Sequence, residues 1–219
     1  MRQQIVACQT LQDEINAIFA QKQIQLPITW IPSGLHNIPA KLTRTVQETL
    51  DNLPPTDQVL MAMAYCGNAL AGVRTGDYSL VIPKMDDCIS LLLGSSAVHN
   101  RQYRGIYFMT AGWIRGERNL MTEYRYTQEK YGVKLGQEIF NAMFKHYTDV
   151  ALLNTGCFDL REAEEETRRT AEVLHLGYRE VPATLSVLTG LFSQSHPDDY
   201  YLTVPPRTEI TNEMLVLAE

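Results

Sequence analysis

Two apolar runs that each lead into a cysteine constrain the fold of this sequence more than any other feature. The first run, residues 59–65, leads directly into Cys66, and the second, residues 80–82, leads through a short polar turn into Cys88. Short apolar runs followed by turn-forming residues are typical of buried parallel strands. In open parallel sheets the ligand site forms beyond the carboxyl ends of the strands. The stretch 59–95 therefore predicts an α/β fold with both thiols at the edge where such a fold carries its chemistry.

The rest of the 219 residues alternates between strand-like and helical segments. Strands are expected at 4–7, 27–31, 105–110, 149–153, 178–181 and 200–204. Helices are expected at 11–20, 39–52, 117–130, 135–147, 159–175 and 183–192, with Thr10 as the cap of the first. This alternation predicts βαβ units and a mostly parallel sheet with helices on both faces, in Rossmann-like layers. One domain, residues 1–219, is expected, and the break near 115–119 is where it could divide into two lobes.

Composition and missing motifs argue against several classes of protein. The net charge of −6, from 25 acidic residues against 19 Lys and Arg, disfavours a nucleic-acid partner, which requires a basic face. No apolar run reaches the roughly 18 residues of a membrane-spanning helix. The first residues lack the apolar core of a signal peptide, so a cytoplasmic protein is expected. The sequence contains no GxGxxG, P-loop, GxSxG or HExxH motif, which removes the commonest nucleotide-binding and hydrolase classes.

The four cysteines share a position in the predicted fold. Cys8, Cys66, Cys88 and Cys157 each follow a strand-like run, directly or after a short turn. In a reducing compartment they are expected to be thiols or ligands rather than disulfides, and without a CxxC pair there is no zinc-ribbon pattern. Thiolates that converge from separate strands suit zinc, an iron–sulfur cluster or another transition metal. The alternative, that cysteine serves here as a small buried hydrophobic residue, is about equally well supported.

A histidine and two glycine turns are further candidates. His36 lies in a turn that ends at Pro39, and imidazole is a common partner of thiolate at a metal, although a ring bonded to its own loop is an equal alternative. The Gly67–Asn68 turn follows Cys66 and would let a ligand approach the backbone.

The second glycine turn joins Gly112 to Trp113, whose indole could form a pocket wall or a core aromatic. Asp86 and Asp87 precede a helical run, so one of them is expected to cap that helix, with a paired acid/base role as the weaker alternative.

Six segments of the sequence resemble one protein family. They are ACQTLQDEI, GLHNIPAKL, YCGNALAGV, LVIPKMDDCISLLLGS, GIYFMTAGW and YYLTVPP, which together span residues 8–206. They are similar to the DUF1638 proteins of anaerobic bacteria and archaea, some of which are encoded near corrinoid-dependent methyltransferases. The resemblance implies a functional pattern at Cys8, His36, Cys66, Gly67, Asn68, Asp87, Cys88, Gly112 and Trp113, with Cys157 outside it. This chain departs from the pattern at Gln9, where glycine is usual, and at Asp86, where histidine is usual and would be a further ligand or proton carrier.

The leading hypothesis is a cytoplasmic metal- or metallocofactor-binding protein linked, through the resemblance, to corrinoid and methyl-group metabolism. Its metal ligands would be Cys8, Cys66 and Cys88, with His36 as the fourth, a set that favours zinc first and an iron–sulfur cluster next. The resemblance adds a corrinoid as a candidate cofactor, and a corrinoid protein or methyltransferase as a candidate partner. The cofactor-contacting residues would be Gly67, Asn68, Asp87, Gly112 and Trp113.

Two alternatives come from other classes of protein. The first is a metal-free enzyme in which Cys88, at the start of a helix, is the nucleophile. The second is a non-catalytic accessory protein that serves a corrinoid methyltransferase system. The sequence leaves open whether the protein is an enzyme.

Overall fold

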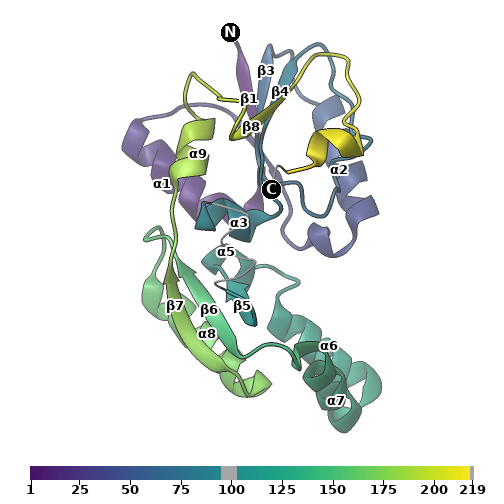
Figure 1. Ribbon diagram of the computed structural model, residues 1–219, viewed down its shortest axis with the longest axis vertical. Helices are drawn as coiled ribbons and strands as arrows, with labels where there is room; N and C mark the ends of the chain where they lie inside the picture. Colours follow the sequence, from purple (N-terminus) through teal and green to yellow (C-terminus); the bar gives the residue numbers. More distant parts are fainter. Residues whose placement is uncertain (95–102, 218–219) are drawn as a thin grey trace.

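The computed structural model describes residues 1–94 and 103–217 and arranges them around two sheets (Figure 1). The first sheet has the order β2–β1–β3–β4–β8 and the second has the order β5–β6–β7. The first comprises β1 (Gln3–Cys8), β2 (Ile28–Ile31), β3 (Gln58–Ala62), β4 (Ser79–Pro83) and β8 (Tyr201–Val204). The second comprises β5 (Ile106–Met109), β6 (Asp149–Asn154) and β7 (Gly177–Pro182). Of the paired strands described, β8 alone runs antiparallel to its neighbour.

The predicted α/β class, with parallel strands in Rossmann-like layers, is confirmed, but the strands form two sheets rather than one. The chain leaves the first sheet after α3 (Cys88–Leu93) and comes back to it after β7, through α9 (Ser186–Leu191). The break expected near 115–119 connects α5 (Ala111–Ile114) to α6 (Leu120–Tyr131), and both helices follow β5. The chain therefore does not pass between the sheets at 115–119, and a division into lobes there stays a prediction.

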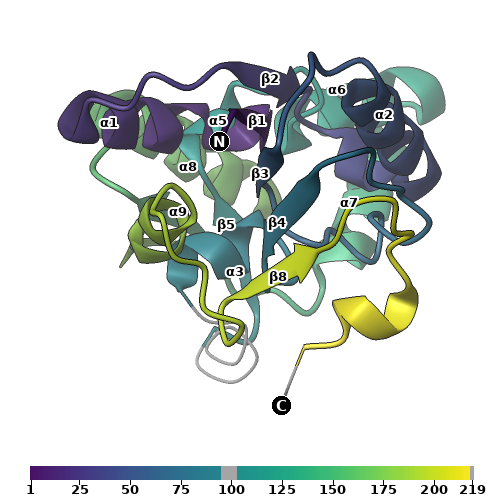
Figure 2. The ribbon, with the colours of Figure 1, turned by 90° about the horizontal axis from the view of Figure 1, so that it is seen from above.

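Helices cover both faces of the first sheet because its strands are apolar on both faces (Figure 2). Alternate residues of β1 point to opposite sides: Ile5 packs with α1 (Gln12–Lys22), α3 and α9, whereas Val6 packs with α2 (Pro39–Asp51). Neighbouring strands repeat this period of two, which is intrinsic to extended backbone. The C-terminal turn η3 (Asn212–Leu215) completes the α2 side.

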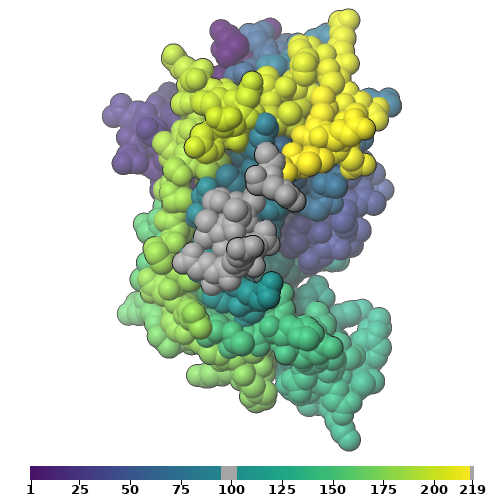
Figure 3. All heavy atoms as spheres, in the orientation of Figure 1, coloured from purple at the N-terminus to yellow at the C-terminus, as the bar shows by residue number. Residues whose placement is uncertain are grey.

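The second sheet has its own core and also contributes to the core of the first. On one face Val150 packs with residues of α6, α7 (Val133–Phe144) and α8 (Leu160–Leu174). On the other face Ala151 and Leu153 belong to the same buried cluster as α1 and α9. Helices α6 and α7 form a hairpin that projects from the body, and a notch separates it from α2 at the surface (Figures 1 and 3). Among the residues described, none of the helices combines the length and the apolar character needed to cross a membrane.

Two glycines, one in α5 and one in the turn after it, allow loops of the first sheet to approach these residues closely. A Cβ at Gly112 would overlap the carbonyl oxygen of Thr10, and a Cβ at Gly116 would lie 2.9 Å from the Oγ of Ser33. We call these two contacts the glycine seam. Thr10 was expected to cap α1, and this was wrong: it lies in the turn η1 (Gln9–Leu11), and the residue before α1 makes no side-chain cap. Its burial beneath α5 explains the difference.

We expect Gly112→Ala to lower the free energy of unfolding by about 1–3 kcal/mol, because the new methyl group would overlap the backbone of Thr10. In an open helical position the same change would stabilise by about 1 kcal/mol, so the sign is diagnostic. Urea unfolding measures it. Unchanged or increased stability would show that α5 does not pack against η1 in this way.

Candidate functional site

The carboxyl ends of strands from both sheets border one cleft of about 640 Å³. The first sheet contributes the exits of β1 to β4, and the second contributes β5 and the residues after it. The chemically relevant lining residues are Cys8, Thr10, His36, Cys66, Gly67, Asp86, Asp87, Cys88, Tyr107, Thr110, Trp113 and Tyr147. This is the place that the rule for open α/β sheets predicts for a ligand.

Parallel pairing brings three of the cysteines to this cleft. Cys8 is the last residue of β1 and pairs with Ile31 of β2, while the preceding residue pairs with Ala62 of β3. Beyond β3 and β4 the two exits stay side by side, because the backbone N–H of Cys66 donates to the carbonyl of Asp86 at 2.8 Å. Cys88 follows two residues later as the first residue of α3.

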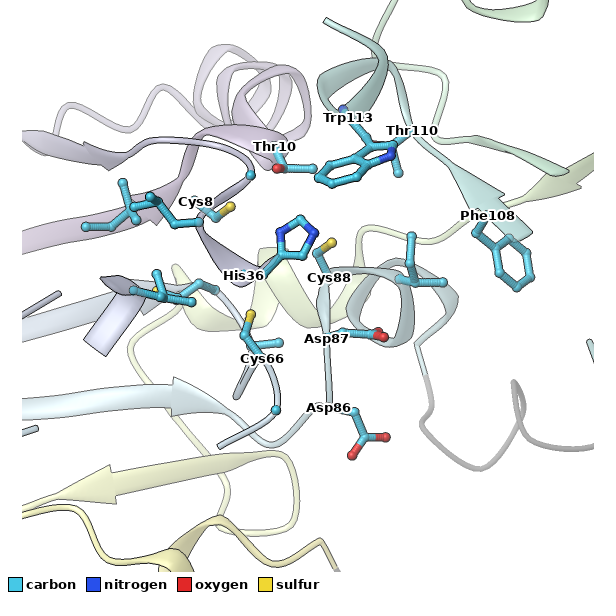
Figure 4. A pocket seen from close by; sticks show the side chains of 18 of the residues that line it. Cys8, Thr10, His36, Cys66, Asp86, Asp87, Cys88, Phe108, Thr110 and Trp113 are labelled. Atoms are coloured by element: carbon cyan, nitrogen blue, oxygen red, sulfur yellow. The ribbon is translucent and has the colours of Figure 1, made fainter. Parts of the chain in front are cut away.

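The three sulfur atoms point toward the imidazole of His36 (Figure 4). His36 belongs to the turn η2 (Leu35–Asn37) after β2, and its ring lies 4.5 Å from the ring of Trp113, centroid to centroid, at an interplanar angle of 41°. The indole N–H of Trp113 in turn donates to the hydroxyl of Tyr107. The second sheet therefore holds a histidine that belongs to the first.

Nearby polar groups lower the pKa of each of the three thiols, but burial has the larger effect. These groups are the backbone and hydroxyl of Thr10 for Cys8, the backbone of Ala64 for Cys66, and its own backbone for Cys88. Burial nevertheless raises the pKa of Cys8, raises that of Cys66 to about 12, and raises that of Cys88 well above its ordinary range. Without a cation nearby, these thiols are protonated at neutral pH.

The thiols lie close enough to influence one another electrostatically. A negative charge on Cys8 raises the pKa of Cys66, and charges on Cys8 and Cys66 both raise the pKa of Cys88. The carboxylate of Asp87 acts in the same direction on Cys66 and Cys88. Of the described residues that line the cleft, none is Lys or Arg. The cleft thus concentrates groups that carry negative charge when ionised.

A left-handed turn presents Cys66 to the cleft. Cys66, Gly67 and Asn68 have successive φ angles of 49°, 66° and 63°, and the N–H of Ala69 closes the turn on the carbonyl of Tyr65 at 3.1 Å. Residues with a side chain lose about 1 kcal/mol or more in this conformation, and such strain gathers at functional sites. Gly67 was predicted as a turn residue from its residue type. The left-handed conformation of its neighbours Cys66 and Asn68 was not predicted from the sequence.

Asp87 has two roles in the structure. Its carboxylate accepts from the N–H of Ser90 at 2.7 Å, which confirms the expected cap of α3. It also lines the cleft, where it opposes the pKa shift of His36. Burial is the larger effect and lowers the pKa of that imidazole, so His36 is neutral near pH 7 and one of its ring nitrogens can accept a proton or a metal.

The structure brings most of the predicted site residues together. All of them line the cleft except Asn68, on the outer side of the left-handed turn, and Gly112, whose Cβ direction faces Thr10. Cys157 lies apart, at the exit of β6, where its thiol donates to the carbonyl of Thr155 at 3.4 Å. Sequence reasoning did not select Thr10 or Tyr107 as site residues. The one feature of the sequence that could have pointed to Thr10 is its position two residues after Cys8.

The donor set has the chemistry of a metal site without the spacing of an occupied one. Thiolates and a neutral imidazole are the preferred ligands of zinc and other soft ions. Within residues 1–94 and 103–217, however, no three Cys, His, Asp or Glu side chains stand close enough together to hold one metal ion as they are placed. A single tetrahedral zinc would therefore require the side chains to move.

Fold and cleft together define an α/β protein whose parallel strands deliver thiols to a cleft between two sheets. A family model described as "Protein of unknown function (DUF1638)" matches residues 30–192 of the 219, and the chain belongs to this family, as the resemblance in its sequence implied. No curated protein and no solved structure matches the chain significantly.

We expect His36 to titrate below the ordinary histidine range in the protein without metal, because burial disfavours the imidazolium ion. The substitution Trp113→Leu opens one side of the His36 ring to water and should raise the pKa of His36. NMR titration of the imidazole resonances measures both values. Trp30→Phe is the matched control, since Trp30 does not line the cleft, and it should leave His36 unchanged. An unshifted His36 in the native protein would contradict the stacked arrangement.

Proposed function

We propose that this protein binds a metallocofactor, or a soft metal ion, in the cleft between its two sheets. Cys8, Cys66 and Cys88 would be the ligands, with His36 as a fourth. The observation that carries the proposal is the convergence of three thiols from three strand exits, beside an imidazole, in a cleft that no described Lys or Arg lines. Thiolate and imidazole are preferred ligands of soft metal ions.

Electrostatics supports a positively charged ligand centre. The carboxylates of Asp86 and Asp87, in a cleft that no described Lys or Arg lines, disfavour an anionic ligand such as a nucleotide phosphate. Buried, mutually repelling thiols become thiolates when a cation neutralises them, so metal binding would release protons. The three thiols, which stay protonated without a cation, would then hold the metal as thiolates.

The size of the cleft favours a metallocofactor larger than one ion, because its volume of about 640 Å³ has room for more than a single ion. In an iron–sulfur cluster the cysteines bind different metals and need not meet at one ion. An iron–sulfur cluster held by three cysteines would keep one metal position open for an exogenous ligand. Zinc and a corrinoid remain outcomes of the test.

The metabolic setting is proposed from the family resemblance alone. The proposed setting is corrinoid and methyl-group metabolism, with a corrinoid protein or methyltransferase as partner. A cytoplasmic location is proposed separately, from the first residues of the sequence. The alternative of a non-catalytic accessory protein has the same partner. It differs because the protein would form a complex with that partner without catalysing a reaction. Both stay predictions.

We expect protein purified without oxygen, or reconstituted with iron and sulfide, to carry metal that depends on the cleft thiols. Cys66→Ala and Cys88→Ala should each lose most of the metal and any visible absorbance, while circular dichroism confirms that they fold. Cys157→Ala is the matched control, because this thiol lies outside the cleft. Elemental analysis and the visible spectrum identify the metal or corrinoid. A protein that stays metal-free under both conditions, or equal loss in the control, would refute the proposal.

If Cys88 were a nucleophile, as in the enzyme alternative, its thiol would need a lowered pKa, whereas burial raises it. A cysteine nucleophile reacts as the thiolate, and burial keeps Cys88 protonated at neutral pH. In metal-free protein we therefore expect alkylation of Cys88 at pH 7 to be slower than that of a free thiol, and to rise about tenfold per pH unit. Mass spectrometry of peptides labelled with iodoacetamide measures the rate. Fast labelling at pH 7 would revive the enzyme alternative.

A further inference from the structure

A buried glutamate joins the two sheets at a point outside the cleft. Glu14 lies on α1 and is 0% exposed. Its Oε1 accepts a hydrogen bond of 2.8 Å from the hydroxyl of Thr155, which follows β6 of the second sheet. The neighbouring Asp13 forms an ion pair with Arg115, the residue after α5. Helix α1 is thus tied to the second sheet by two polar contacts.

Only half of the Glu14 carboxyl group is satisfied. Its Oε2 is buried and has no hydrogen-bond partner among the described residues. A buried carboxylate with one unpaired oxygen loses its hydration without full replacement, so burial favours the neutral acid over the ion.

Few groups among the described residues act on Glu14. Burial is the largest influence and raises its pKa; hydrogen bonds from its own backbone and from Thr155 lower it, Asp13 raises it and Arg115 lowers it. The charge of Glu14 in turn raises the pKa of Cys157, on the same loop as Thr155. Arg115 is already paired with Asp13, and no other cation of the described residues acts on Glu14.

We propose that the Glu14–Thr155 contact is a proton-dependent latch between the two sheets. The seam around this contact stays closed and dry while Glu14 carries its proton. When the carboxyl group ionises, Thr155 still donates to it, but the unpaired Oε2 draws water into the buried seam and loosens the packing. This behaviour follows from the burial and the unpaired oxygen of one side chain, and it needs no ligand.

The latch lies where it can affect the cleft. Helix α1 directly follows η1, which contains Thr10, and Thr10 lines the cleft together with Cys8. On the other side, β6 leads into Thr155, while its residue Leu153 shares a buried cluster with Leu11 and Ile15. If the packing around Glu14 and Thr155 loosened, the side of the cleft that carries Cys8 would move relative to β5. We therefore expect access to the cleft to increase with pH.

The sign of the pH dependence follows from the raised pKa. The native state holds the proton to a higher pH than the unfolded chain, so the stabilisation is complete below the unfolded pKa and is lost as pH rises through the folded one. In that interval the folding equilibrium constant should fall by up to tenfold per pH unit from this group. Glu14→Gln keeps the acceptor oxygen for Thr155 and removes the proton equilibrium.

The first experiment compares urea unfolding of the metal-free native protein, Glu14→Gln and Glu117→Gln across pH 4 to 8. Glu117 is an exposed acid on the turn after α5 and serves as the matched control. We expect the native protein and the control to lose stability together as pH rises. Glu14→Gln should lose less, and it should be the most stable of the three above the pKa of Glu14 in the folded protein. Equal pH dependence in all three would overturn the proposal. Because no metal is added, the result does not depend on the proposed cofactor.

The second experiment separates a latch from a general effect on stability. Thr155→Val removes the donor and should move the loss of stability to higher pH, because the carboxylate loses its one cross-sheet hydrogen bond. Amide hydrogen exchange, corrected for its intrinsic pH dependence, should then accelerate at residues 9–14 and 154–157 before the centre of β3, in native protein and not in Glu14→Gln. Uniform acceleration, or an unmoved transition in Thr155→Val, would show that Glu14 titrates without acting as a latch.

Discussion

The parallel register of β1, β3 and β4 is the constraint on which the rest of this structure depends. Pairing of Ala7 with Ala62 sets two strand ends at one edge, and the hydrogen bond from Cys66 to Asp86 carries the pairing into the turns beyond. Thiols separated by many residues in the sequence thereby become neighbours. A slip of one residue in β1 would exchange its core faces and turn Cys8 away from the cleft.

The second determinant is the absence of a compensating cation among the described lining residues. Desolvation and mutual repulsion keep the thiols neutral, and Asp87 reinforces this while also capping α3. The cap fixes the start of the helix and so places Cys88, which means that one carboxylate positions the thiol and also adds to the raised pKa that burial gives it. An arrangement of this kind is unfavourable for a free thiolate and becomes favourable once a cation is bound.

Local patterns in the sequence predicted the elements well and their partners less well. The apolar run 80–82 became β4 because a strand buried on both faces has a recognisable composition. The runs that became β5 to β7 look alike locally, and only long-range packing assigns them to a second sheet. Gly112 shows the same limit: its residue type indicated a close approach, but the group that approaches is the backbone of Thr10 rather than a ligand. The convergence of Cys8, Cys66 and Cys88 was predictable because it needs only strand ends and parallel pairing.

The two sheets contribute different things to the cleft, and this makes their attachment part of its chemistry. The first sheet supplies the thiols on a rigid backbone, whereas Trp113, held by Tyr107, comes from the second and fixes the ring of His36. The glycine seam holds α5 against η1 through close packing, which tolerates little movement. The Glu14–Thr155 contact is instead polar, buried and half-satisfied, so its strength depends on a single proton. Movement between the sheets should therefore begin at Thr155 and be resisted at Gly112, which would open the cleft from the α1 side while His36 stays on Trp113.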